Sequence, residues 1–442
     1  MRFAFLPTRR LFLLLLVVAP LLMIATLWRG LLVLPLVYLI GLAVLVVLDA
    51  RTAPKLADLM IEREHDERLS LGEANLVELR VRWNGTDASD RRLWVRDEIP
   101  SGLPSDHTPF SGTLAPGGDW TGRYHLHPIR RGEYRFGHVV LRVETERELL
   151  VWQGARQLEP LARVYPNILA VRRYELLARQ GRLQEVGLRR TRLTGAGTEF
   201  ERLREYQADD DYRRINWKAT ARRQQPVTMV YETERSQNLL VLLDSGRLMG
   251  TPINDILKLD HAVNAALMLA YVAMEMGDRA GMVVFADRVE GFVLLGRGRR
   301  QFQLLLESLY RVPSLPIEAD PVQALHFISR RQLKRSLVVM FTDLAEGVQP
   351  DALIAALGQL ARRHLPVCVM VSNPDIIRLA VLVPENSQQA YEKVVAQRLL
   401  DERHAIIERI QRQGALVLDV PAEQLTSGII NRYLEIKART RL

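Results

Sequence analysis

Two long apolar runs near the N-terminus constrain this 442-residue chain more than any other feature of its sequence. Leu11–Trp28 and Leu31–Leu48 each contain 18 residues. An α-helix of that length spans ~27 Å, close to the ~30 Å hydrocarbon core of a bilayer. Only Arg29 and Gly30 separate the runs, so a tight turn must join them. We therefore predict that residues 1–50 form a membrane anchor of two helices.

Basic residues flank both outer ends of this hairpin. Arg2, Arg9 and Arg10 precede the first run, and Arg51 and Lys55 follow the second. Positive charge gathers on the cytoplasmic side of membrane helices, so both outer ends are expected in the cytoplasm. A cleaved signal peptide is the alternative, but a second span follows at once. The sequence thus predicts a multi-pass plasma-membrane protein whose soluble part is cytoplasmic.

Charge and cysteine content limit the kinds of partner and of covalent link that the chain can have. The net charge of +9 comes from 60 basic and 51 acidic residues, which favours contact with anionic membrane lipid or an acidic partner. The two signs are interleaved, so the charge does not by itself predict nucleic-acid binding. The one cysteine, Cys368, lies in the apolar run Pro366–Val371. That position indicates core packing and excludes an intramolecular disulfide.

Residues 71–160 carry the pattern of a β-sandwich-like domain. From Leu76 onward the side chains alternate, so that one face is apolar and consists of Val77, Leu79, Val81 and Trp83. Further short strands are expected at Leu93–Ile99, Tyr124–His127, Tyr134–Phe136, Val139–Val143 and Leu149–Gln153. Short strands divided by turn residues are typical of a sandwich. The polar residues 51–70 before them are expected to be a juxtamembrane linker.

Residues 237–442 alternate apolar strands with amphipathic helices, beginning with the strand Leu239–Leu243. This alternation predicts an α/β domain with a mostly parallel, doubly wound sheet. In such sheets, ligands bind beyond the carboxyl ends of the strands. Asp244 follows the first strand, and Asp343 follows the later strand Leu337–Thr342. We therefore expect both carboxylates at one edge of the sheet.

Residues 161–236 contain an unusually charged stretch, Glu205–Arg223. Asp209–Asp211 can cap a helix, since carboxylates accept hydrogen bonds from first-turn N–H groups. A helix is expected directly after them, followed by a strand at Val227–Thr233.

This stretch closely resembles the signature of a bacterial family known as domain of unknown function 58. Members share a Tyr-rich, acidic start and an Arg-Arg-Ile-x-Trp-Lys-Ala-Thr-Ala-Arg core, which runs here from Arg213 to Arg222. The residues that carry the signature are Tyr206, Asp210, Arg213, Arg214, Trp217, Lys218 and Arg222. Pro7–Arg10, Arg131–Tyr134 and Val164–Pro166 also resemble the family.

The resemblance implies a bacterial inner-membrane protein with a von Willebrand A-like domain. It also implies a functional link to a MoxR-type AAA+ ATPase, with a transglutaminase-like membrane protein as a further partner.

The von Willebrand A fold normally binds a divalent ion at its strand tips, through an Asp-x-Ser-x-Ser motif, a later threonine and a final aspartate. Mg²⁺ prefers a near-octahedral shell of oxygens. Here Gly246 and Leu248 take the serine positions, and Ala319 best matches the threonine, so that Asp244 and Asp343 alone remain. We therefore predict a degenerate metal site, with no cofactor and at most weak Mg²⁺ binding.

Arg247 lies beside the first of these acids in the sequence. A guanidinium can bridge two carboxylates in place of an ion. We therefore predict that Asp244, Arg247 and Asp343 form a charged face that binds a protein partner.

These observations favour an interaction module, namely a non-enzymatic, membrane-anchored adaptor that works with a MoxR-type AAA+ ATPase in protein assembly or maturation. One alternative is an enzyme that uses the Asp209–Lys218 stretch for acid–base chemistry. Another is a nucleic-acid-binding protein that uses the arginines. The sequence has no Walker, GxSxG, HExxH or CxxC motif, which disfavours the common enzyme classes. It also has no zinc finger or aromatic-interleaved RNA motif, so no nucleic-acid partner is expected.

Overall fold

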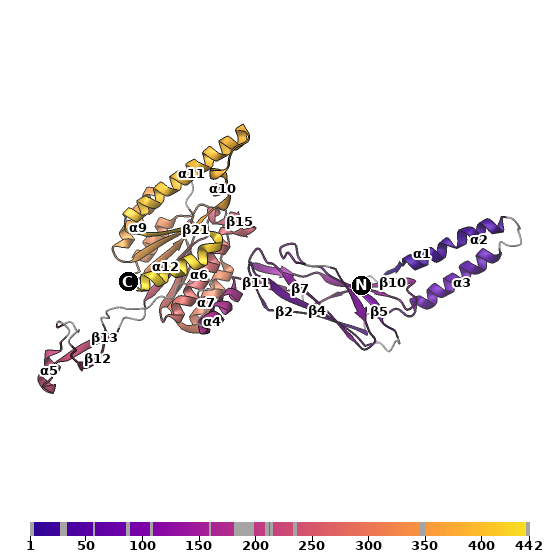
Figure 1. Cartoon of the computed structure of the whole chain (residues 1–442), viewed down its shortest axis with the longest axis horizontal. Helices are drawn as coiled ribbons and strands as arrows, with labels where there is room; N and C mark the ends of the chain where they lie inside the picture. The colour runs from indigo at the N-terminus through magenta and orange to yellow at the C-terminus, as the bar shows by residue number, and fades with distance from the viewer. Residues whose placement is uncertain are drawn as a thin grey trace. The chain divides into compact units, whose positions relative to one another are not determined.

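The computed structural model describes most of the chain and divides it into two units (Figure 1). Unit 1 comprises Met1–Tyr165 and unit 2 comprises Pro166–Leu442. The described residues are 4–26, 33–55, 58–84, 89–106, 109–158, 161–180, 199–207, 212, 215–232, 237–331, 333–343 and 350–438.

The apolar N-terminal region of unit 1 is helical. Its helices are α1 (Arg9–Leu16), α2 (Val18–Ala25) and α3 (Val33–Ala50). The first predicted run is interrupted at Val17, because Pro20 has no N–H group to donate to the carbonyl of Leu16. Within the described ranges, α3 alone is long and apolar enough to cross a membrane. Trp28 and the turn Arg29-Gly30 lie outside the described residues.

The helices pack into a hairpin along an apolar seam. Leu11 of α1 and Leu42 of α3 are buried together with Leu150 of the β region. The hydroxyl of Tyr38 donates a hydrogen bond to the carbonyl of Leu14, at 2.9 Å. These contacts hold α1 against α3.

The rest of unit 1 is built of short β-strands. Val77, Leu79 and Val81 of β4 are completely buried, which confirms the predicted alternation. The strands form sheets of order β1-β10-β9-β5-β6, β2-β4-β7 and β3-β11-β8. Their bounds are β1 Ala4–Pro7, β2 Leu59–His65, β3 Arg68–Ser70, β4 Asn75–Trp83, β5 Arg91–Asp97, β6 Phe110–Leu114, β7 Asp119–Leu126, β8 Gly132–Arg135, β9 His138–Glu144, β10 Leu150–Gln157 and β11 Leu161–Tyr165.

The predicted juxtamembrane linker over residues 51–70 is wrong for its second half, which forms β2 and β3. β2 contains several charged residues, so its alternation of apolar side chains is not evident in the sequence. One of them, Arg63, has a buried partner: its guanidinium approaches the carboxylate of Asp97 to 2.5 Å. The hydroxyl of Tyr124 donates to the same carboxylate, at 2.7 Å. A charge that is paired in this way can be buried in a core strand.

Unit 2 contains a six-stranded sheet, which confirms the predicted α/β architecture. The strand order is β18-β17-β14-β19-β20-β21. Numbered along the chain from β14, this order is 3-2-1-4-5-6. All neighbours are parallel except β18, which is antiparallel to β17. The strands are β14 Asn238–Asp244, β17 Arg279–Phe285, β18 Val289–Gly296, β19 Leu337–Phe341, β20 Leu365–Ser372 and β21 Leu416–Pro421.

Helices cover both faces of this sheet (Figure 1). On one face, α8, α9 and α11 pack on alternate strand residues such as Leu240, Val338 and Met370. Cys368 is fully buried in this core, as predicted, and burial raises the pKa of its thiol to about 12. On the other face lie α6, α7 and α12. The helices are α4 Ile168–Arg179, α6 Lys258–Glu275, α7 Gly298–Arg311, α8 Pro321–Ser329, α9 Pro350–Ala361, α10 Pro374–Val381, α11 Ser387–Arg412 and α12 Leu425–Ala438.

The remaining elements of unit 2 are short. The turn η5 (Arg247–Gly250) follows β14, and the small hairpin of β15 (Pro252–Ile253) and β16 (Ile256–Leu257) leads into α6. The turn η6 (Ala422–Gln424) precedes α12. Before the sheet, β12 (Glu199–Glu205) pairs with β13 (Val227–Glu232), and α5 (Trp217–Arg223) lies between them in the chain.

Candidate functional site

The two predicted acids lie at the carboxyl ends of neighbouring strands. Asp244 ends β14, and Asp343 follows β19 after Thr342. β14 and β19 pair directly, and the strand order reverses between them, because β17 lies on one side of β14 and β20 on the far side of β19. Doubly wound sheets bind their ligands at this point. We call the surface formed by Asp244, Arg247, Lys258, Asp343 and Arg403 the strand-tip face.

Asp244 is held by hydrogen bonds from the protein itself. The hydroxyl of Thr342 donates to its Oδ2 at 2.6 Å, and the main-chain N–H of Gly246 donates to its Oδ1 at 2.8 Å. The side chain is buried, with 3% exposed. Burial, with a smaller contribution from the nearby Asp343, raises the pKa of Asp244 to about 6, and the two hydrogen bonds limit this shift.

Asp343 is neutralised by two cations from different helices. The ammonium of Lys258, at the start of α6, lies 2.5 Å from its Oδ2. The guanidinium of Arg403, in α11, lies 2.9 Å from its Oδ1 and also contacts Asp419 of β21 at 2.9 Å. Burial alone would lower the pKa of Arg403, but Asp419 and Asp343 raise it above its usual range. The acid at the strand tip therefore lies in a charge network that the chain supplies.

The structure corrects the predicted role of Arg247. The cations that contact Asp343 are Lys258 and Arg403, whereas the side chain of Arg247 is exposed. The loop explains the difference, because the main-chain N–H of Arg247 donates to the carbonyl of Ile317 at 2.8 Å. Arg247 thus lies at the rim of the strand-tip face, and its predicted part in partner binding stays a prediction.

The two small residues at the predicted hydroxyl positions face each other. A Cβ placed on Gly246 would lie 2.9 Å from the Cβ of Ala319 and 3.0 Å from the carbonyl oxygen of Ile317. Both distances are shorter than ordinary van der Waals contact, and the carbonyl belongs to the main chain. A serine hydroxyl therefore cannot occupy position 246 unless the loop moves.

Oxygen ligands for an ion are correspondingly few. The described ranges contain no group of three or more His, Cys, Asp or Glu side chains that could hold a metal. Asp244 and Asp343 remain the two acids nearest to such a site, and both already accept hydrogen bonds from protein groups. The prediction of no cofactor and weak Mg²⁺ binding stays a prediction.

The signature segment is described in part. Asp210, Arg213 and Arg214 lie outside the described residues. The predicted helix begins at Trp217, several residues after the aspartates, because Asn216 caps it by accepting a hydrogen bond from the N–H of Ala219.

The other described signature residues lie on this short helix or next to the β12–β13 pair. Ile215 forms a β-bridge with Thr228 instead of a helical turn. The N–H of Tyr206 donates to the carbonyl of Pro226 at 2.9 Å, next to the β12–β13 pair. Trp217, Lys218 and Arg222 are exposed on α5, with 70% of Trp217 accessible.

Lys258, Arg403 and Asp419 are the site residues that sequence reasoning missed. Lys258 and Arg403 lie 85 and 60 positions from Asp343 along the chain. Lys258 is the first residue of α6, and Arg403 is one of many charged residues on α11. The sequence signal for Lys258 was a lysine at the start of an apolar helix. That signal is weak, because most lysines in such a position are exposed to solvent.

Comparison with known proteins gives a family match for the segment that contains this site. Residues 202–404 match the family described as Protein of unknown function DUF58. This confirms the resemblance for the signature residues from Tyr206 onward and for the α/β region as far as residue 404. The N-terminal segments that also resemble the family lie outside the matched residues.

Relatives in mycobacteria share the same region. Uncharacterized proteins of Mycobacterium tuberculosis and Mycobacterium bovis are each 26% identical to this chain over 213 residues. The aligned region covers 47% of this chain and 66% of each relative, just under two thirds of the relatives' length.

Two solved structures show a weak likeness. The conserved hypothetical protein BatB from Bacteroides thetaiotaomicron has 13% identity and a TM-score of 0.32, over 46% of this chain and 99% of that one. Proximal thread matrix protein 1 from the mussel byssus has 12% identity and a TM-score of 0.31, over 46% and 47%. At these scores neither structure bears on the fold of this chain.

Proposed function

We propose that this chain is a membrane-anchored adaptor whose strand-tip face holds a protein partner without a metal ion. The observation that carries the proposal is the pairing of the buried Asp343 carboxylate with Lys258 and Arg403. In a metal site built from carboxylates, the bound ion neutralises the negative charge of the carboxylates. Here the protein's own cations do so, and the resulting charged face is already organised for contact with a partner.

The burial of the acids supports binding rather than catalysis. A general acid or base must reach the proton that it transfers. Asp244 and Asp343 are only 3% and 8% exposed, and both are engaged by other protein groups. The exposed Arg247 at the rim is better placed to touch a partner than either acid.

The strand order supports a von Willebrand A-like domain, in agreement with the family resemblance. The sheet has the order 3-2-1-4-5-6 with an antiparallel edge strand, and its two acids lie at the switch point. This step rests on likeness of fold, which by itself does not establish function.

The N-terminal helices support the anchor. α3 has the length and composition of a membrane span, and the apolar residues of α1 and α2 pack along it as the second arm of a hairpin. Arg9, Arg10 and Arg51 lie at the outer ends of the arms, which favours a cytoplasmic soluble part at the bacterial inner membrane.

The partner that we propose is a MoxR-type AAA+ ATPase, acting with this chain in protein assembly or maturation. A transglutaminase-like membrane protein is a further candidate. Both come from the family resemblance.

Capture of the ATPase tests the proposal. The tagged full chain is solubilised in detergent and immobilised, and binding of the purified MoxR-type ATPase of the same bacterium is measured. We expect Asp343→Asn to weaken capture strongly, because removing one member of a buried charged pair at an interface typically costs about 2–5 kcal/mol. Arg247→Ala removes an exposed charge at the rim of the face and should weaken capture less, mainly by slowing association. Arg363→Ala, an exposed arginine after α9, is the matched control and should change little.

Thermal melting of each variant is recorded alongside, because loss of the charge network could unfold the domain. If Arg247→Ala and Asp343→Asn both stay folded and capture is unchanged, the strand-tip face is not the docking surface.

A further inference from the structure

A second candidate surface lies at the antiparallel edge of the sheet, where β18 is two strands away from β14. In the part of the chain that the structure describes, β18 pairs with β17 alone. Its outer row of main-chain N–H and carbonyl groups is therefore open to another strand. Exposed edges of this kind are templates for pairing with an added segment.

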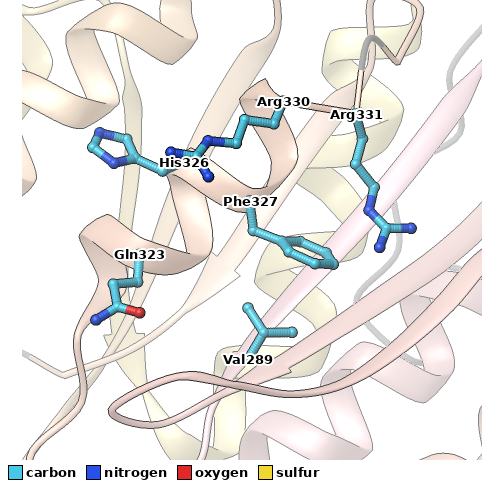
Figure 2. A pocket seen from close by; sticks show the side chains of 6 residues that line it. All are labelled: Val289, Gln323, His326, Phe327, Arg330 and Arg331. Carbon is cyan, nitrogen blue, oxygen red and sulfur yellow. The ribbon is translucent and has the colours of Figure 1, made fainter.

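A cavity of about 600 Å³ lies beside this edge, between β18 and α8 (Figure 2). It is lined by Val289, Gln323, His326, Phe327, Arg330 and Arg331. Figure 2 shows that five of these side chains come from α8 and the residues after it, and that Val289 lies across from them. Three of the six are basic, and no acidic side chain lines the cavity.

The aromatic floor of the cavity is ordered by packing. Phe327 of α8 meets Phe292 of β18 edge to face, with ring centroids 5.5 Å apart. The guanidinium of Arg331 lies 4.3 Å from the centroid of each ring. These cation–π contacts fix a positive charge over the edge strand.

The geometry of a sheet relates the outer edge of β18 to the cavity. A strand added beyond β18 would lie about 4.8 Å farther out, and alternate side chains would point toward the α8 side. His326 and Phe327 of α8 and Arg330, which follows it, lie on that side, since they line the cavity together with Val289 of β18. The cavity is thus the space that the side chains of an added strand would enter, and its charge favours carboxylates there.

We propose that the β18 edge and this cavity bind an extended acidic peptide segment of a partner protein. The main chain of the segment continues the sheet, and its carboxylate side chains enter the cavity beside Arg330 and Arg331. Main-chain pairing supplies affinity in this mode, and pockets for alternate side chains supply specificity.

Fluorescence anisotropy with short synthetic peptides tests this directly on the full chain in detergent micelles. The probe is a labelled peptide of four Glu-Val repeats, which alternates acidic and β-branched side chains. A Lys-Val peptide tests charge, and a Glu-Pro peptide keeps the negative charge but lacks half of the main-chain donors.

We expect the Glu-Val peptide to bind and Arg330→Glu to weaken its binding by about tenfold or more, because the substitution places like charges together. Arg363→Glu makes the same change of net charge outside the cavity and should alter binding by less than about twofold. The Lys-Val and Glu-Pro peptides should bind at least about tenfold more weakly than the Glu-Val peptide.

Three results would overturn the proposal. Equal effects of Arg330→Glu and Arg363→Glu would mean general attraction to a basic protein. Equal binding of the Glu-Pro and Glu-Val peptides would show that the peptide does not pair with β18 as an added strand. Concentration-dependent self-association that blocks the Glu-Val peptide would assign the edge to a second copy of this chain. None of these measurements depends on the strand-tip face or on the ATPase, so the two proposals can fail separately.

Discussion

At the strand tips, the ammonium of Lys258 approaches one oxygen of Asp343 and the guanidinium of Arg403 approaches the other. The side chains of Lys258 and Asp343 are 10% and 8% exposed. Paired charges at this depth are costly to separate, since the remaining partner stays buried.

Lys258→Met should therefore lower the free energy of unfolding of unit 2 by roughly 2–4 kcal/mol, less than for a fully unpaired charge because Arg403 remains. The double variant Lys258→Met/Asp343→Asn should recover part of the loss, because no buried charge is then left without its partner. Hydrogen exchange of the β14 and β19 amides measures this within unit 2. Arg398→Ala breaks the exposed pair with Glu402 and serves as the control, with a change within about 0.5 kcal/mol.

Asp244 should make the stability of unit 2 depend on pH. Its pKa of about 6 in the folded chain exceeds the ordinary value of 3.8. Between these values the unfolded chain loses the proton while the folded chain keeps it, so stability falls as pH rises from about 4 to 6. The full effect of one such group is about 3 kcal/mol.

Asp244→Asn should remove this contribution. The difference in unfolding free energy between pH 4 and pH 7 should then shift by up to about 3 kcal/mol relative to the native chain. Exchange rates of the β14 amides at both pH values give that difference. An unchanged difference would mean that Asp244 ionises normally in the fold.

Sequence reasoning located the two acids but not their partners, for a physical reason. A carboxylate after a buried strand must emerge at the strand end, so Asp244 and Asp343 could be placed from the strand pattern. Lys258 and Arg403 come from helices far away in the sequence, and their approach depends on how those helices cross the sheet. Arg247 was expected to bridge the two acids, but main-chain hydrogen bonds at Gly246 and Arg247 fix the loop and leave its side chain exposed.

Among the elements, those with a strong apolar pattern were predictable. β19 was predicted at Leu337–Thr342 and spans Leu337–Phe341, because strands buried on both faces are continuously apolar. α8 and α10 were missed, since each is short and begins with proline at its first position, where proline also marks turns. β2 was missed because charged residues that pair inside the fold resemble a solvated linker.

The connection between α3 and the β region depends on one carboxylate. Asp49, near the end of α3, is completely buried. It accepts hydrogen bonds from the N–H of Arg147 at 2.8 Å, from the N–H of Leu149 at 3.1 Å and from the hydroxyl of Thr145. Thr8, which caps α1, donates to the carbonyls of Glu148 and Leu149. Both arms of the hairpin therefore hold the same turn.

Asp49→Ala should loosen this turn, because the buried amide of Leu149 loses its acceptor, at about 1–3 kcal/mol, and the partly buried amide of Arg147 loses its acceptor as well. We expect faster trypsin cleavage after the exposed Arg147 in the detergent-solubilised chain. Asp66→Ala, at an exposed turn, is the control. Equal cleavage of the native chain and Asp49→Ala would show that the turn does not need the helix.

At the scale of the whole molecule, unit 1 joins the apolar hairpin to a β region, and unit 2 carries the α/β sheet. The charge at both outer ends of the hairpin predicts that the β region of unit 1 and the whole of unit 2 lie in the cytoplasm. A reporter that is active only in the periplasm, fused after Leu442, should stay inactive. An active reporter would contradict the hairpin topology, and a reporter that is active only in the cytoplasm provides the reciprocal control.

We infer that protein cations and small residues take the place of an ion at the strand tips. Calorimetric titration of Mg²⁺ into the full chain in detergent micelles tests this most directly, with Asp244→Ala titrated in parallel. Because Lys258 and Arg403 already neutralise Asp343 and no hydroxyl fits at Gly246, we predict no saturable heat at physiological Mg²⁺ concentrations for either protein. A clear 1:1 isotherm for the native chain that Asp244→Ala abolishes would show that the strand tips bind Mg²⁺ despite these cations.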